Sequence, residues 1–169
     1  MSSIIVVYGD SSSSRKVITR NTIPEPSNFY RSSKLQADEG IKILGSNNFK
    51  VVIIRSPIVY GENSKGNYPL LSKAAQYLPI FPDIDNERSL IHIANLCEFI
   101  KLMTDNEESG IFFPQNKEYA KSSEMVRLIA EVHGKQIRMT KLFNPILRLM
   151  SGTNIVNKVF GNLVYEQSL

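Results

Sequence analysis

A tyrosine and a lysine four residues apart form the pair of side chains best suited to chemistry in this sequence. Tyr30 and Lys34 lie in the segment YRSSK, and this spacing puts them on one face of a helix. A free phenol has a pKa near ~10, so it is a poor base at neutral pH unless a nearby positive charge favours the phenolate. Lys34 supplies such a charge, so the pair indicates a proton-transfer site. The alternative is that the pair lies on a surface helix without a catalytic role, where the same spacing is common.

The elements that must position this pair can be read from the surrounding residues. The apolar runs Ile4–Val7 and Val51–Ile54 predict two buried strands. Between them, Ser27 or Asn28 can cap a helix over residues 29–44. Continuous apolar runs are typical of parallel strands that are covered on both faces. We therefore expect a right-handed strand–helix–strand crossover that carries the tyrosine and the lysine on its helix.

The rest of the chain predicts short strands alternating with helices. Ser122 is the expected cap of a helix that Gly134 closes. The other predicted strands and helices are strands over 89–93 and 110–113, and helices over 68–78, 143–150 and 155–160, with a further helix that buries Leu96, Phe99, Ile100 and Met103.

Composition limits the class of protein. The 169 residues are 42% hydrophobic and 21% charged, which excludes a disordered or collagen-like chain. The single cysteine, Cys97, cannot form an internal disulfide, and with only His92 and His133 it cannot complete a zinc site. We therefore expect no metal, a reducing compartment and a cytoplasmic location. No apolar run is long enough for a membrane span.

The net charge of +4 is unevenly distributed. Residues 135–163 contain Lys135, Arg138, Lys141, Arg148 and Lys158 but no Asp or Glu. Such a face can bind an anionic ligand, nucleic acid or a membrane surface, although a solvated surface is the commoner interpretation. Basic and aromatic residues do not alternate as in single-strand binders, so we expect no nucleic-acid partner. A peripheral binding module built on these basic helices is a third hypothesis for the function.

Five motifs occur in an order that carries a family resemblance. They are a strand that starts at two serines and ends in VYGD, then YRSSKLQADEG, VVIIRSPIVYG, GNYPLL and RSLIHIANLCEFI. In this order the sequence resembles the extended short-chain dehydrogenase/reductase family, in particular its NAD-dependent nucleotide-sugar epimerases and dehydratases. The resemblance runs through almost the whole chain. It implies an α/β fold, namely the C-terminal part of a Rossmann-like parallel sheet plus a small mixed substrate-binding region.

The resemblance also implies roles for individual residues. Tyr30 would be the catalytic acid/base, and Lys34 would hold the cofactor ribose and favour the phenolate. Ser3, or the serine before it, would hydrogen-bond the reacting hydroxyl, and Pro57 would line the nicotinamide. Ser3 lies five residues before Tyr8 instead of the family's usual four, a change that on a continuous strand would reverse the face of the side chain.

On the substrate side, the resemblance implies that Asn67 contacts the substrate and that Arg88 pairs with its diphosphate. Guanidinium forks match phosphate oxygens, and the alternative for Arg88 is a surface salt bridge. Ile58 stands where galactose epimerases place asparagine, which favours reductase-like or polysaccharide-associated relatives. We interpret His92 as a structural residue.

The implied reaction is NAD-dependent epimerisation of a nucleotide sugar of the UDP-hexose class, used for cell-surface polysaccharide. The alternatives are a keto-sugar reductase or dehydratase of the same family, or a truncated product without catalysis. The chain contains no Gly-rich strand-to-helix turn for a pyrophosphate, since GENSKGNY lacks the required context.

This missing motif predicts how the chain is organised. We expect residues 1–60 to be a remnant of the nucleotide-binding domain that carries the YxxxK helix. Residues 61–169 would be mainly the substrate-binding region, with one strand near 110–113 returning to the sheet. The chain alone is then expected to be an inactive fragment with doubtful NAD binding, and its exposed sheet edge would permit a homodimer.

Overall fold

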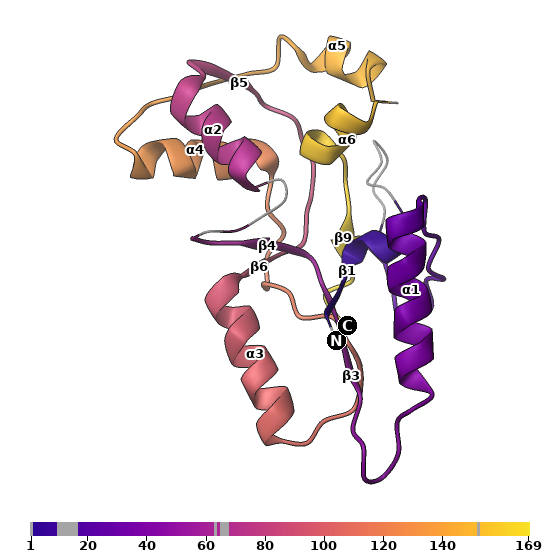
Figure 1. The fold of residues 1–169 in the computed structure, drawn as a ribbon. Helices are drawn as coiled ribbons and strands as arrows, with labels where there is room; N and C mark the ends of the chain where they lie inside the picture. The colour runs from indigo at the N-terminus through magenta and orange to yellow at the C-terminus, as the bar shows by residue number, and fades with distance from the viewer. Residues whose placement is uncertain (1, 10–16, 63, 65–67, 152) are drawn as a thin grey trace.

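A three-stranded parallel sheet carries the first part of the chain in the computed structural model, which describes residues 2–9, 17–62, 64, 68–151 and 153–169. Its strands are β1 (Ser2–Ile4), β3 (Val52–Ser56) and β7 (Gly110–Phe112), in the order β1-β3-β7. Helix α1 (Phe29–Lys42) connects β1 to β3 (Figure 1). The predicted parallel strand–helix–strand unit is therefore confirmed, and so is the α/β fold class.

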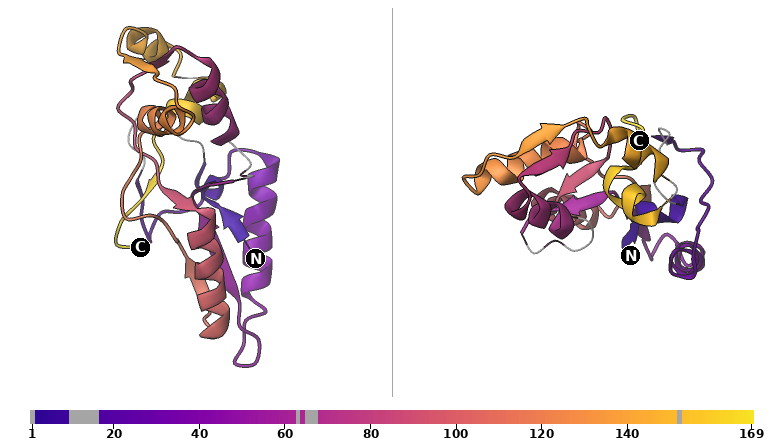
Figure 2. Two further views of the ribbon diagram at one scale, coloured as in Figure 1. Left: turned by 90° about the vertical axis from the view of Figure 1, so that its left-hand side faces the viewer. Right: turned by 90° about the horizontal axis from the view of Figure 1, so that it is seen from above.

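Helices cover both faces of this sheet. α1 lies on one side and α3 (Ile93–Asp105) on the other, as two perpendicular views show (Figure 2). Successive residues of β3 point to opposite faces: Ile54 packs with Leu96 of α3, whereas Arg55 meets Asp38 of α1. Burial on both faces explains why the apolar run in β3 is continuous rather than alternating.

A second layer is built from short parallel strand pairs and two packed helices. β4 (Ile58–Tyr60) pairs with β6 (Leu90–His92), and β5 (Ile80–Pro82) pairs with β8 (Arg138–Thr140). Helix α2 (Tyr68–Tyr77) packs against α4 (Ser122–Val132), and their buried residues form one apolar core with β5. α5 (Asn144–Leu149) and α6 (Asn154–Phe160) follow (Figure 1).

The predicted strand over Ile4–Val7 is wrong beyond its first residue. β1 ends at Ile4, and the chain then turns into the 3-10 helix η1 (Ile5–Tyr8). This turn buries Val7 and Tyr8 against β2 (Val17–Ile18) and β9 (Val164–Tyr165), which pair with each other in parallel. Burial against distant residues overrides the local strand preference, so β-branched residues alone mispredict this segment.

Helix caps were predicted with mixed success. Asn28 caps α1, since its side chain accepts a hydrogen bond from the backbone N–H of Arg31 at 3.0 Å. Gly134, with a φ of +67°, closes α4 as expected. Ser122 is not a cap: it is the first residue of α4, and its buried hydroxyl donates to the backbone carbonyl of Val159. The Ser122 hydroxyl therefore bonds to a carbonyl of α6 and does not cap α4.

In the part of the chain that the structure describes, no helix combines the length and apolar composition needed to cross a bilayer. No three His, Cys, Asp or Glu side chains among the same residues are grouped for a metal ion.

Candidate functional site

The first turn of α1 lies at the carboxyl edge of the parallel sheet. α1 runs from the end of β1 back to the start of β3, so its N-terminus lies beside the carboxyl ends of both strands (Figure 1). Tyr30 occupies this turn and is 54% exposed. Open α/β sheets bind their ligands at this edge, so the tyrosine is placed where a reacting group is accessible.

Lys34 lies beside Tyr30, as the helical spacing predicts. Its Nζ is 5.7 Å from the centroid of the tyrosine ring. An ammonium at this distance from an aromatic ring makes a favourable cation–π contact. The structure therefore brings the two side chains together on one face of α1.

Ser3 and Pro57, to which the resemblance gives catalytic-site roles, lie in β1 and directly after the neighbouring strand β3. The backbone of Ser3 in β1 is in register with Arg55 of β3, and Pro57 follows directly after β3 and is fully buried. Because the chain leaves the strand at Ile4, the alternation of faces does not extend to Tyr8. The argument that the fifth-residue spacing reverses Ser3 therefore does not apply. Asn67 lies outside the described residues.

Arg88 is buried instead of being on the surface. It is 4% exposed, its Nε donates to the carbonyl of Gly161 at 3.0 Å, and its Nη2 donates to that of Asn157 at 2.8 Å. The surface salt bridge considered from the sequence is therefore wrong. Burial lowers the pKa of Arg88 to about 10, which leaves it protonated at neutral pH. Carbonyl dipoles stabilise the positive charge of the guanidinium. No carboxylate among the described residues forms an ion pair with it.

A buried polar cluster behind α1 was not predicted. Arg55 of β3 donates through Nη1 to the hydroxyl of Tyr8, and its Nε lies 3.5 Å from Oδ2 of Asp38, which is 2% exposed. Burial raises the pKa of Tyr8, against the opposing effect of the Arg55 charge. Two signals were present in the sequence: a cation inside the run VVIIR, and an acid four residues after Lys34. The contact between Arg55 and Asp38 connects α1, which carries Tyr30, to the central strand β3.

A cavity of about 1100 Å³ borders this cluster. Tyr8, Asp38 and Arg55 line it, together with Leu35 of α1 and Phe113 after β7. Its described lining does not include Tyr30 or Lys34. The cavity therefore borders the later turns of α1 and not its first turn.

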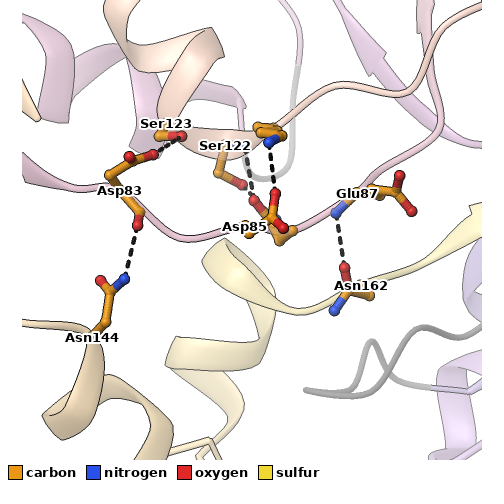
Figure 3. A network of polar contacts seen from close by, with 9 residues as sticks. Asp83, Asp85, Glu87, Ser122, Ser123, Asn144 and Asn162 are labelled. Atoms are coloured by element: carbon orange, nitrogen blue, oxygen red, sulfur yellow. Dashed lines mark hydrogen bonds and ion pairs between the residues drawn. The ribbon is translucent and has the colours of Figure 1, made fainter. Parts of the chain in front are cut away.

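Hydrogen bonds join the segment Asp83–Glu87 to α4, to α5 and to the residues after α6 (Figure 3). The carboxylate of Asp83 accepts from Ser123 Oγ at 3.1 Å, and its carbonyl accepts from Asn144 Nδ2 at 2.9 Å. The backbone N–H of Glu87 donates to Asn162 Oδ1 at 2.8 Å. A polar cavity of about 460 Å³ lies beside this segment, and both residues whose carbonyls bind Arg88 contribute to its lining.

His92 is a capping residue in this structure. Its Nδ1 accepts from the backbone N–H of Ala94 at 3.3 Å at the start of α3, and its ring packs edge to face on Tyr60. Both contacts agree with the structural interpretation.

Known proteins resemble this chain in sequence and in fold. Residues 1–113 match the NAD dependent epimerase/dehydratase family. The chain is 30% identical over 156 residues to a UDP-glucose 4-epimerase from Vibrio cholerae. The alignment covers 85% of this chain and 47% of that protein. The chain thus spans about half the length of this relative.

Two solved structures show the same fold. The UDP-glucose 4-epimerase of Thermus thermophilus in complex with NAD has a TM-score of 0.64 and 20% identity, over 82% of this chain and 49% of that one. A dTDP-4-dehydrorhamnose reductase from Clostridium acetobutylicum has a TM-score of 0.65 and 16% identity, over 82% and 48%.

A parallel sheet covered on both faces, with a tyrosine and a lysine at its carboxyl edge, defines a Rossmann-like α/β protein. Within that class, the match over residues 1–113 places the chain in the NAD-dependent epimerase/dehydratase family. The resemblance inferred from the five motifs is confirmed.

Proposed function

We propose that this chain supplies the proton-transfer and substrate-binding residues of an NAD-dependent epimerase that acts on a nucleotide sugar of the UDP-hexose class, used in polysaccharide synthesis. The observation that supports the proposal most directly is the accessible Tyr30 with Nζ of Lys34 5.7 Å from its ring, at the carboxyl edge of the sheet. The identity to a UDP-glucose 4-epimerase favours epimerisation.

The residues present fit one end of NAD. Tyr30 and Lys34 offer a hydroxyl and an ammonium on one accessible helix face, which suits the hydroxyls of a ribose, and Pro57 follows the adjacent strand. The 169 residues contain no Gly-rich turn that would seat the pyrophosphate. A bound NAD would supply reversible acceptance of a hydride from the sugar. We propose that this chain alone holds the cofactor too weakly to turn over.

Each catalytic residue has a defined part in the proton transfer. The phenolate oxygen of Tyr30 accepts the proton of the sugar hydroxyl, the O–H electron pair forms the C=O bond, and the C–H bond breaks with loss of hydride. Lys34 stabilises the phenolate before this transfer, and Ser3 orients the hydroxyl. In the return step Tyr30 gives the proton back to the same oxygen.

Substrate binding is assigned to Arg88 and Asn67. The charge of Arg88 is buried without a carboxylate partner among the described residues, so a nearby diphosphate would compensate it. The second candidate function is a keto-sugar reductase or dehydratase. Ile58 favours it, because this residue packs against the apolar core and offers no amide to a substrate.

Titration calorimetry with the 169-residue chain tests the proposal. We expect UDP-glucose to bind and NAD to show no measurable binding. We also expect no conversion of UDP-galactose in the presence of NAD. Asn67→Ala should weaken UDP-glucose binding by about tenfold, the equivalent of one lost hydrogen bond, whereas Asn48→Ala in an exposed loop should not. Absence of UDP-glucose binding would overturn the substrate assignment, and tight NAD binding would overturn the division of roles.

A further inference from the structure

One face of α5 and its flanking residues borders the polar cavity of about 460 Å³. Lys141, Asn144, Leu147, Arg148 and Ser151 line this cavity, and their spacing of three and four residues is that of a single helix face. The other described walls come mainly from the segment between β5 and β6 and from α6. Two cations seven residues apart are therefore directed to the same cavity.

The charges of the described lining residues do not balance. Lys121, Lys141 and Arg148 are set against two carboxylates, those of Asp83 and Asp85. Asp85 already forms an ion pair with Lys121 at 2.6 Å. No ion pair among the described residues includes Lys141 or Arg148. The cavity therefore has an excess of positive charge, which attracts an anionic ligand.

Arg88 adds a further positive charge behind one wall of the cavity. Its guanidinium donates to the carbonyls of Asn157 and Gly161, and both of these residues line the cavity. Because Arg88 is buried, solvent and salt screen its charge less than they screen the charge of a surface residue. This buried cation therefore adds to the attraction for an anion.

Asn144 leaves a buried hydrogen-bond acceptor at the cavity. Its Nδ2 donates to the carbonyl of Asp83 at 2.9 Å, which fixes the orientation of the amide (Figure 3). Its Oδ1 is buried and has no hydrogen-bond partner among the described residues. A buried acceptor without a donor costs free energy, so a ligand hydroxyl at this position would be stabilising. The lining thus calls for a negative charge and a hydroxyl in one ligand.

We propose that this cavity binds a phosphate group that is carried next to a sugar hydroxyl. Lys141 and Arg148 would bind the phosphate oxygens, and Oδ1 of Asn144 would accept from the hydroxyl. The volume lies within the range of about 300–1,000 Å³ that is usual for small-molecule sites. A nucleotide sugar and a simple sugar phosphate both offer this chemistry. In the first case the proposal rests on the proposed function, and it adds three residues to the substrate site.

Titration calorimetry of the full chain at low ionic strength tests the proposal with UDP-glucose and with glucose 1-phosphate. We expect at least one of the two ligands to bind, and the one that binds identifies the source of the phosphate. Arg148→Gln and Lys141→Gln should each weaken this binding by about tenfold, the equivalent of one charge-assisted hydrogen bond. Both side chains are exposed, so we expect the circular dichroism spectra of the variants to match that of the parent.

Arg138→Gln is the matched control. Arg138 is exposed in β8 and lies outside the described lining of the cavity, so this variant removes the same charge elsewhere and should bind like the parent. Equal losses in Arg138→Gln and Arg148→Gln, or no binding of either ligand, would overturn the proposal. UDP-glucose binding that Asn67→Ala weakens and Arg148→Gln does not would overturn it while leaving the proposed function intact. Binding of glucose 1-phosphate alone, weakened in Arg148→Gln, would support the cavity and contradict the proposed substrate.

Discussion

Removal of one hydroxyl from each of two neighbouring buried tyrosines should change stability in opposite directions. Tyr8 and Tyr165 are both buried, and their rings pack edge to face with centroids 6.4 Å apart. The hydroxyl of Tyr8 accepts a hydrogen bond from Arg55, whereas the hydroxyl of Tyr165 is buried without a hydrogen-bond partner among the described residues. Tyr8→Phe therefore removes a charge-assisted hydrogen bond, and Tyr165→Phe removes an unsatisfied polar atom.

The magnitudes follow from these two environments. A hydrogen bond to a charged group contributes about 1.5–3 kcal/mol, so Tyr8→Phe should lower the free energy of unfolding by about 2 kcal/mol. Burial of an unsatisfied hydroxyl costs about 1–3 kcal/mol, so Tyr165→Phe should raise that free energy by about 0.5–1 kcal/mol after partial relaxation. At about 2–4 °C per kcal/mol, the melting temperatures of the two variants should differ by roughly 5–12 °C.

Urea denaturation followed by far-ultraviolet circular dichroism measures both changes. The two variants should share the m-value of the parent chain, because neither changes the surface exposed on unfolding. A Tyr165→Phe variant destabilised as much as Tyr8→Phe would refute the reasoning, since it would show that the hydroxyl of Tyr165 has a partner in solution.

Three further predictions concern the same scaffold. Gly61→Ala should lower the free energy of unfolding by at least about 2 kcal/mol, because φ is +136° and an added Cβ would lie 2.6 Å from a side-chain atom of Ile93. Gly40→Ala should instead raise it by about 0.5–1 kcal/mol, because an added Cβ in α1 would meet nothing within 4 Å. Thermal melts distinguish the two variants. Asp38→Asn should cost about 2–4 kcal/mol, since it leaves a buried arginine without its carboxylate, and a loss below about 0.5 kcal/mol in urea denaturation would contradict the buried pair. Burial raises the pKa of Tyr8 and Tyr165 above 10, so the folded chain keeps protons that the unfolded chain releases, and stability should fall as the pH rises above this value; a phenolate titration should show a late step that coincides with unfolding.

Local patterns predicted the elements that hold the proposed catalytic pair. Asn28 before an amphipathic stretch is enough to begin α1, and the four-residue spacing is enough to bring Lys34 to Tyr30. The continuous apolar run before Pro57 likewise predicted a strand covered on both faces. Each of these signals depends on residues within a few positions of one another.

Contacts between distant segments were not predicted. The turn of η1 depends on burial of Tyr8 against Tyr165, and the burial of Arg88 depends on the carbonyls at the end of α6. A charged residue inside an apolar run, such as Arg55, indicates that a partner exists but does not say which acid it is. For this reason the sequence predicts the adjacency of Tyr30 and Lys34 better than it predicts the contacts of Arg88.

The pairing of β2 with β9 has a consequence for synthesis of the chain in the cell. This strand pair joins Val17 and Ile18 to Val164 and Tyr165, which lie far away in the sequence. Tyr165 also completes the apolar cluster around Val7 and Tyr8. Val17 and Ile18 therefore stay without their final packing until Val164 and Tyr165 have left the ribosome, which makes them a binding segment for chaperones during translation.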